Sequence, residues 1–174
     1  VGAQFDATQA LSVHYLHAID VSRPYERWMV LARTGGENAP IRFADLGLAA
    51  DREYLAFEFW TKSFLGPFTG ALPPGDVDPR FGVQVFCLRE RASRPQFVAT
   101  NRHVSCGAMD VSNVTWTNDS IDGVSSVVAG DPYELYLTEP PGYAFVEALI
   151  VGAEVAANEK VGPLRRLRLL SARG

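Results

Sequence analysis

One long apolar and aromatic run, 52–66 (REYLAFEFWTKSFLG), most constrains how this chain can fold. The residues of an extended strand alternate between two faces, and here both faces are apolar, with Glu58 as the one interruption before a turn expected at Gly66-Pro67. The two sets are Tyr54, Ala56 and Trp60 on one face and Leu55, Phe57 and Phe59 on the other. Such a strand needs cover on both faces. A small β-domain covers one of them, so the sequence predicts a neighbour on the other.

The rest of the chain repeats this period of two and shows almost no helical period. The expected strands are 14–19, 27–34, 40–44, 53–61, 68–72, 82–89, 96–100, 111–117, 123–128, 133–138, 145–151, 154–158 and 164–170. Residues 7–11 are expected to form at most a short helical turn, and 45–49 a loop. Short strands separated by Gly, Pro, Asn and Asp clusters are typical of antiparallel sandwiches. We therefore expect an all-β fold of antiparallel β-sandwiches with little helix.

The segment 90–95 (ERASRP) divides this pattern into two parts. It is charged, contains a proline and has no apolar period, so we interpret it as a linker. The predicted domains are 1–92 and 93–174. Each has about eighty to ninety residues, a size at which a lone core is marginal. We expect the two β-units to pack together or onto something larger.

Composition and charge exclude several classes of partner. Hydrophobic residues make up 47% of the chain, which is enough for a packed core. The net charge of −4 argues against nucleic acid or an anionic membrane as a partner. In the basic C-terminal cluster, Arg166 and Arg168 alternate with leucines, which indicates the solvated face of a strand. No apolar run is long enough for a transmembrane helix. Because the chain begins at Val1, we expect that a leader or a larger N-terminal part has been removed.

Cysteine and histidine usage predicts neither a disulfide framework nor a metal centre. Cys87 lies in an apolar run and is interpreted as a buried small side chain, while a bridge to Cys106 has no support from the sequence. His14 and His17 are three residues apart, which places them on opposite faces of a strand. With His103 as the third histidine and no Cys-x-x-Cys pair, we expect no zinc site and no cofactor.

No catalytic motif stands out. The chain lacks the Gly-x-Ser-x-Gly elbow, the P-loop and the dinucleotide fingerprint. Paired acids would suffice for glycoside cleavage, and the candidates are Asp45, Asp51, Glu53, Glu58, Asp110, Asp122, Asp131 and Glu134. Most fall at turns or at outward strand positions, as Asp131 and Glu134 do, and Asp76 with Asp78 fits a turn better than a calcium site. Glu58 stands in an apolar strand, and we favour an arginine partner across an interface over a role in a site.

The three tryptophans could serve as platforms for sugar rings. Trp28 and Trp60 lie in strongly apolar strands, so packing is the better interpretation for both. Trp116 ends an expected strand beside a polar loop and is the best candidate for a sugar-binding platform, although packing is still the favoured interpretation.

The pattern resembles the C-terminal β-region of α-galactosidase (melibiase)-like glycoside hydrolases. In the first part the resemblance rests on 45–48 (DLGL), 54–60 (YLAFEFW), 64–66 (FLG) and 83–89 (VQVFCLR). In the second part it rests on 100–104 (TNRHV), Cys106-Gly107, Asp110, Trp116 and 130–135 (GDPYEL). The loop 74–81 is longer than the hairpin of the pattern.

The resemblance implies a non-catalytic role and a partner. The nucleophile and acid/base of such enzymes lie on a (β/α)₈ barrel, for which this chain has neither the alternation of strands and helices nor the length, so no catalytic residue is assigned. The implied partner is the catalytic barrel of the same parent chain, with Trp60, Glu58 and Phe64 at the interface. The alternatives are a carbohydrate-binding module that contacts galactosides or other glycans through exposed aromatics such as Trp116, self-association through apolar strands, and a small enzyme built from surface carboxylates.

Overall fold

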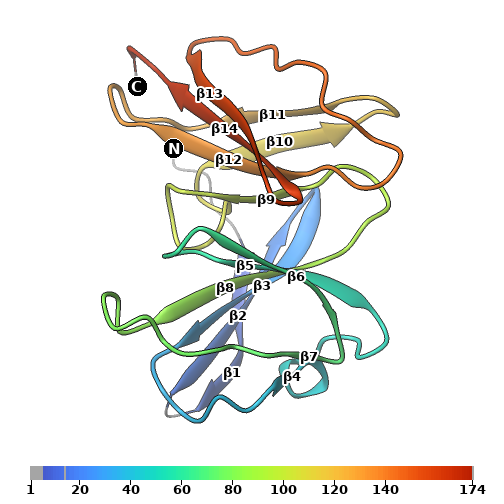
Figure 1. Cartoon of the computed structure of the whole chain (residues 1–174), viewed down its shortest axis with the longest axis vertical. Helices are drawn as coiled ribbons and strands as arrows, with labels where there is room; N and C mark the ends of the chain where they lie inside the picture. The colour runs from blue at the N-terminus through green and yellow to red at the C-terminus, as the bar shows by residue number, and fades with distance from the viewer. Residues whose placement is uncertain (1–5, 14, 174) are drawn as a thin grey trace. The chain divides into compact units, whose positions relative to one another are not determined.

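The computed structural model describes residues 6–13 and 15–173, and these form antiparallel β-strands joined by turns (Figure 1). The expected all-β fold with sandwich-like sheets is confirmed. The chain separates into two compact units, with the boundary between Arg91 and Ala92. We refer to residues 6–91 as the N-terminal unit and to residues 92–173 as the C-terminal unit.

The N-terminal unit is built on a six-stranded antiparallel sheet with the order β1-β2-β3-β8-β5-β6. Its strands are β1 (Asp6–Val13), β2 (Leu16–Arg23), β3 (Glu26–Arg33), β5 (Glu53–Glu58), β6 (Ser63–Thr69) and β8 (Gln84–Glu90). A smaller segment consists of β4 (Ile41–Arg42), the 3₁₀ helix η1 (Phe43–Leu46) and β7 (Ala71–Leu72), with β4 paired to β7.

The core of this unit lies between one face of the large sheet and that smaller segment. Leu31, Ala56 and Phe86 of the sheet and Phe43 of η1 have no exposed surface, and Tyr54 packs edge-on against Phe43 at 5.0 Å between ring centroids. Burying a large apolar side chain contributes about 1.5–3 kcal/mol, so this cluster is the main source of the unit's stability.

The opposite face of the sheet is also apolar, as the sequence predicted. Cross-strand pairing places Phe57 opposite Cys87, and Leu55 opposite Arg89, on this face. Arg89 is fully buried, pairs with Glu26 at 2.5 Å and lies over the Trp28 ring at 3.8 Å from its centroid. Trp28 is 3% exposed, which agrees with its interpretation as a packed residue.

The strand expected over 53–61 is shorter than predicted. β5 ends at Glu58, a tight turn follows with Lys62 at φ 57°, and β6 begins at Ser63. The Gly66-Pro67 pair is therefore not a turn. It lies inside β6, where the register with β5 shifts near Gly66, and a proline is tolerated because β6 is the edge of the sheet.

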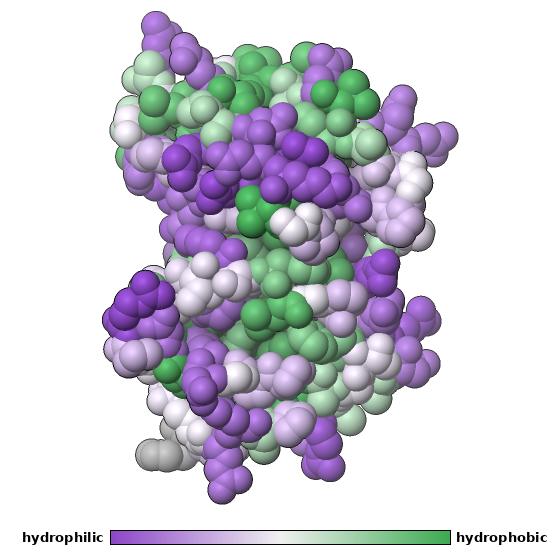
Figure 2. Space-filling model, viewed as in Figure 1, coloured by the Kyte–Doolittle hydropathy of each residue, from purple (hydrophilic) through white to green (hydrophobic). Residues whose placement is uncertain are grey.

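The C-terminal unit contains a four-stranded sheet with the order β13-β14-β12-β9 and a separate hairpin of β10 and β11. The strands are β9 (Phe97–Thr100), β10 (Val111–Trp116), β11 (Ile121–Ser125), β12 (Tyr133–Thr138), β13 (Glu154–Val161) and β14 (Leu164–Leu170). Tyr133, Leu167 and Leu169 form a small buried cluster. β12 and β14 have the bounds that the sequence predicted, and on β14 Arg166 is half-buried and Arg168 exposed. Figure 2 shows a band of hydrophilic residues on this unit.

Other expected segments differ from the structure. Residues 7–11 belong to β1 and not to a helical turn, because they pair with β2 across a tight hairpin. The strand expected over 40–44 is cut short where η1 begins at Phe43, and η1 also takes the start of the loop expected at 45–49. The strand expected over 145–151 forms no ladder and belongs to a long connection between β12 and β13. His14 lies outside the described residues.

Cys87 and Cys106 are both buried, and no disulfide joins them. Across the described residues, no helix has the length and apolar character needed to cross a membrane.

Candidate functional site

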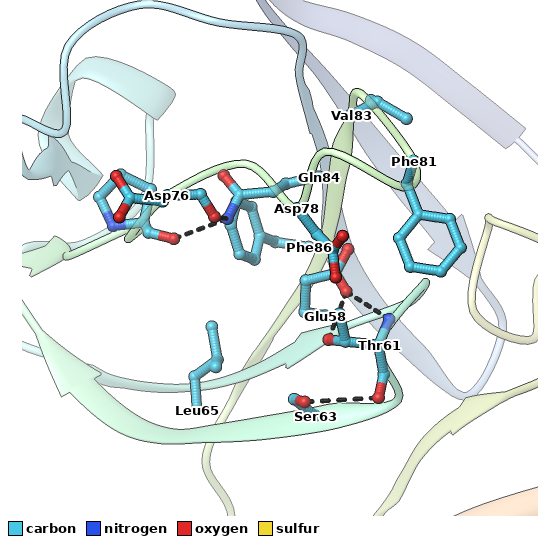
Figure 3. Close-up of a pocket in the computed structure, with 11 residues that line it drawn as sticks. Glu58, Thr61, Ser63, Leu65, Asp76, Asp78, Phe81, Val83, Gln84 and Phe86 are labelled. Carbon is cyan, nitrogen blue, oxygen red and sulfur yellow. Dashed lines mark hydrogen bonds between the residues drawn. The ribbon is translucent and has the colours of Figure 1, made fainter.

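A pocket of about 220 Å³ opens in the N-terminal unit beside the β5–β6 turn (Figure 3). Its lining comes from β5, β6, the loop before β8 and the start of β8. The lining residues are Glu58, Thr61, Ser63, Leu65, Pro74, Asp76, Asp78, Phe81, Val83, Gln84 and Phe86. Ligand pockets usually measure about 300–1,000 Å³, so this one encloses only a small group or part of a larger ligand.

Glu58 is the buried carboxylate of the pocket and is 4% exposed. One oxygen, Oε2, accepts hydrogen bonds from the backbone N–H and the hydroxyl of Thr61, both at 2.6 Å. The other, Oε1, accepts the backbone N–H of Val85 at 3.0 Å. The carboxylate therefore closes the turn after β5 and ties it to β8, which explains why β5 stops at this residue. These partners all belong to Glu58's own unit, and the arginine partner across an interface that we favoured from the sequence stays a prediction.

A buried arginine organises the loops behind the pocket. Arg33 is 2% exposed and donates to Gln84 Oε1 at 2.6 Å, to the carbonyls of Gly75, Gly36 and Glu37, and to Asn38 Oδ1. Gln84 in turn donates to the carbonyls of Pro74 and Asp76, and Asn38 donates to Asp76 Oδ1. One guanidinium thus fixes the loop after β3 and the loop before β8, and with them the pocket wall.

Asp78 shapes the turn at the pocket mouth. Its carboxylate accepts hydrogen bonds from the side chain and backbone of Arg80, and these lower the pKa of Asp78 below its usual value. Its carbonyl accepts the N–H groups of Phe81 and Gly82. This is the turn role that the sequence favoured for the 76–78 segment.

Exposed aromatic side chains stand at the rim. Phe81 and Trp60 are stacked at 5.7 Å with 19° between their planes, and their exposed fractions are 39% and 36%. Phe59 meets Trp60 edge-on, and the Lys62 ammonium lies 4.1 Å from the Phe59 ring centroid. The packed position predicted for Trp60 is therefore wrong, because the turn after Glu58 directs its ring outward.

The three residues predicted for an interface do not share one face. Glu58 pairs in register with Ser63 and lies in the pocket, whereas Phe64 pairs with Phe57 on the opposite face of the sheet and is half-buried. Of the three, only Trp60 presents a large exposed apolar surface.

The chemistry available in the pocket is limited. Glu58 and Gln84 are held by the hydrogen bonds of their own unit, and Asp78 is paired with Arg80. Asp76 is exposed and keeps one carboxylate oxygen without a hydrogen bond to the described residues. The arrangement offers an apolar wall and a few rim acceptors that suit hydroxyl groups, but no adjacent acid and base that could work as a catalytic pair.

A second polar cluster lies in the C-terminal unit around Asp110, which is 4% exposed. Tyr133 donates its hydroxyl to Asp110 Oδ2 at 2.7 Å, while Oδ1 is buried without a hydrogen-bond partner among the described residues. Burial raises the pKa of Asp110 despite the opposing effect of the Tyr133 hydroxyl. Burial and the neighbouring carboxylate also raise the pKa of Tyr133.

Glu134 occupies a different place from the solvent-side position that the sequence predicted. It is 7% exposed, accepts the Tyr136 hydroxyl at 2.5 Å and accepts Arg168 at 2.9 Å. Burial raises the pKa of Glu134, but these hydrogen bonds and the charges of Arg166 and Arg168 outweigh it and leave the pKa below its usual value. The alternation of the strand was correct, but the arginines of β14 cover this position.

Trp116, the predicted sugar platform, has contacts within the C-terminal unit. Its ring is half-buried, and the Arg94 guanidinium lies 3.8 Å from the ring centroid, so that one ring face is occupied. Its indole N–H donates to the Pro95 carbonyl at 3.2 Å. The aromatic ring therefore secures the segment that leads into β9.

Several residues between 100 and 110, where the sequence resembles the hydrolase β-region, have structural roles in the C-terminal unit. The Asn101 side chain donates to the Pro132 carbonyl and accepts the Glu134 N–H, which continues the β9–β12 pairing beyond the strand. Gly107 has φ 104°, and a Cβ atom there would lie 2.4 Å from the Phe97 ring, so only glycine fits. His103 shares its Nδ1 with the Ser105 hydroxyl at 2.8 Å.

Sequence reasoning did not single out Arg33 or Phe81. Arg33 had one signal, a charged residue at the end of the apolar strand β3, and Phe81 had the neighbouring Gly82. Neither signal indicates which residue the side chain would contact.

In the part of the chain that the structure describes, no three His, Cys, Asp or Glu side chains are grouped so as to hold a metal ion. Comparison with protein-family models, curated proteins and solved structures gave no significant match.

Proposed function

We propose that this chain is a non-catalytic β-region of an α-galactosidase-like glycoside hydrolase and that it packs on and stabilises the catalytic (β/α)₈ barrel of its parent. The observation that carries the proposal is the exposed Trp60–Phe81 stack beside a pocket whose buried acid, Glu58, is bonded to its own turn. The resemblance of 54–60 and 100–104 to the corresponding segments of such enzymes supports it.

The chemistry of the rim favours packing over catalysis. Trp60, Phe81 and Leu65 are each more than a third exposed and belong to the turn, the loop and the edge strand that border the pocket. Figure 2 shows hydrophobic residues on the N-terminal unit in the area where β5, β6 and β8 are labelled in Figure 1. Aromatic residues contribute strongly to the desolvated centres of protein interfaces, so this rim suits a protein partner.

The packing role is tested by binding. The chain is titrated into the barrel of an α-galactosidase-like hydrolase from which its own β-domain has been removed, and heat release and the barrel's melting temperature are recorded. We expect saturable binding, a higher melting temperature, and binding at least about tenfold weaker for Trp60→Ala with Phe81→Ala. The control is Val124→Ala, an exposed change in the C-terminal unit. Absence of binding by the wild-type chain would refute the packing role.

The non-catalytic role has its own test. We expect the purified chain to release no product from an aryl α-galactoside at any pH. Turnover that follows the chain through purification and is lost in Asp76→Asn would show that the pocket is an active site.

A carbohydrate-binding role is the second candidate, and the same rim favours it. The pocket lining contains the exposed Phe81 ring, the Ser63 hydroxyl and an Asp76 carboxylate oxygen that has no hydrogen bond to the described residues. Together they offer a stacking surface and acceptors for sugar hydroxyls. Galactose, melibiose and raffinose are titrated while tryptophan fluorescence is followed. Binding at the rim predicts a saturable change that survives Trp116→Ala and disappears in Phe81→Ala. A fluorescence change that is lost in Trp116→Ala and kept in Phe81→Ala would instead place the sugar site at Trp116. No fluorescence change in the wild type would favour the packing role alone.

A further inference from the structure

The connection between β12 and β13 contains an apolar segment, 144–151 (AFVEALIV), with two distinct sides. Phe145, Ala148 and Ile150 pack on the buried cluster of the C-terminal unit. Val146, Leu149 and Val151 point away from it, with exposed fractions of 88%, 85% and 101%. Figure 2 shows hydrophobic residues in the area of this unit along which the connection runs in Figure 1. From Ala148 to Val151 the side chains alternate between the two sides as those of a strand do, whereas Val146 and Glu147 are both exposed. No neighbouring strand pairs with the segment among the described residues.

The main chain of this segment has no hydrogen-bond partner among the described residues. None of residues 144–151 takes part in a strand ladder, a turn or a side-chain hydrogen bond. Every residue in it carries an N–H donor, since none is a proline. Backbone groups beside three exposed apolar side chains are an incomplete sheet edge that another extended segment can complete.

The composition of the segment points to a copy of itself as that partner. It has high β-propensity, one charged residue, Glu147, and no proline, glycine, lysine or arginine. Segments of this type pair with identical segments unless charges or prolines prevent it. The edge strand β6 has such protection, because it contains Gly66 and Pro67 and follows Lys62. The 144–151 segment has no glycine, proline or lysine and only one charge, that of Glu147.

We propose that two copies of this chain associate by antiparallel pairing of their 144–151 segments about a two-fold axis. Each segment would supply the backbone partners that the other lacks, and the outward row of Leu149 and Val151 would meet its counterpart. This proposal stands on the C-terminal unit alone and does not depend on the proposed barrel-packing role.

Sedimentation or light scattering over a wide range of chain concentrations tests the proposal. We expect the mass to rise from 19.0 kDa to twice that value in the wild type. Leu149→Lys should remain monomeric, because a charge in the outward row opposes pairing. The matched control Val124→Lys, at a 54% exposed position on β11, should dimerise as the wild type does. Circular dichroism and thermal melting establish that both variants are folded.

Hydrogen exchange distinguishes strand pairing from a simple side-chain contact. The amides of 144–151 should exchange slowly in a concentrated sample and rapidly in a dilute sample or in Leu149→Lys. A chain that is monomeric at every concentration, a Leu149→Lys variant that dimerises normally, or a dimer without protection of these amides would each overturn the proposal. A complex formed only with a hydrolase barrel would overturn it as well.

Discussion

Each unit of this chain contains a buried glutamate, and the two are held in different ways. Glu58 of the N-terminal unit accepts hydrogen bonds from the backbone N–H groups of Thr61 and Val85. Glu134 of the C-terminal unit accepts from the side chains of Tyr136 and Arg168. The first glutamate therefore fixes the path of the main chain around a turn, and the second fixes two paired strands, β12 and β14, to each other.

The same contrast extends to the neighbours of each glutamate. Arg33 donates mainly to loop carbonyls, whereas Asp110 is bonded to the Tyr133 hydroxyl. Side chains that bond to each other can relax together when one is changed, but backbone groups in fixed loops lose their partner outright. Substitutions of the backbone-bonded residues should therefore cost more stability than substitutions of the side-chain pairs.

The largest effect is expected for Arg33→Met. This change leaves several loop carbonyls and the Gln84 side chain without their donor, and we expect a loss of about 3 kcal/mol in the free energy of unfolding. Urea denaturation followed by tryptophan fluorescence measures it. Arg27→Met, on the same strand but 70% exposed, is the control and should change stability by less than about 1 kcal/mol. Equal effects of the two changes would contradict the anchoring role.

Glu58→Ala should cost slightly less, about 2–3 kcal/mol, because it leaves the N–H groups of Thr61 and Val85 unpaired. The measurement is again urea denaturation. Glu53→Ala at the exposed start of β5 is the matched control, and its surface pair with Arg91 is worth less than about 1 kcal/mol. A Glu58→Ala variant as stable as this control would show that water replaces the carboxylate.

Glu134→Gln should lower the free energy of unfolding by about 1–2 kcal/mol at neutral pH, since the charge-assisted bond from Arg168 is lost. The lowered pKa of Glu134 gives this contribution a pH dependence. It is present above the usual pKa of 4.5 and is lost as the pH falls through the folded-state value. The difference in the free energy of unfolding between the wild type and Glu134→Gln should therefore shrink as the pH is lowered. Glu159→Gln on β13 provides an exposed control.

Asp110→Asn should give the smallest effect, with the opposite dependence on pH. The pKa of Asp110 is raised, so its contribution is fully present below 3.8 and is lost as the pH rises through the folded-state pKa. Relative to Asp110→Asn, the wild type should lose stability as the pH rises from acidic to neutral. Denaturation curves across this range measure the difference. If the wild type instead gains stability relative to Asp110→Asn on going to neutral pH, burial does not raise the pKa of Asp110.

The sequence predicted those parts of the fold that depend on local alternation. Strands 133–138 and 164–170 have their predicted bounds because each contains a leucine pair two residues apart, Leu135 with Leu137 and Leu167 with Leu169, and turns flank them. The prediction failed at Glu58, where one carboxylate captures the following turn and ends the strand. It failed differently at 145–151, where alternation of burial holds only from Ala148 to Val151 and does not specify a hydrogen-bonding partner.

The candidate site was less accessible to sequence reasoning than the fold. Trp60 meets Phe81, and Arg33 meets Gln84, and both contacts join residues that are distant along the chain. Composition gives the residue types for such contacts but not the loop paths that bring them together. Glu58 was recognised as unusual, but its partners are backbone groups, which have no signature in a sequence.

The two buried thiols have a practical consequence. Cys87 lies at the centre of the N-terminal unit and Cys106 in the C-terminal unit, and neither is oxidised to a disulfide. A thiol that is shielded when folded reacts with an alkylating reagent only after its surroundings open. Mass spectrometry of digested, alkylated protein would therefore report the opening rate of each half separately, in one sample and without any engineered label.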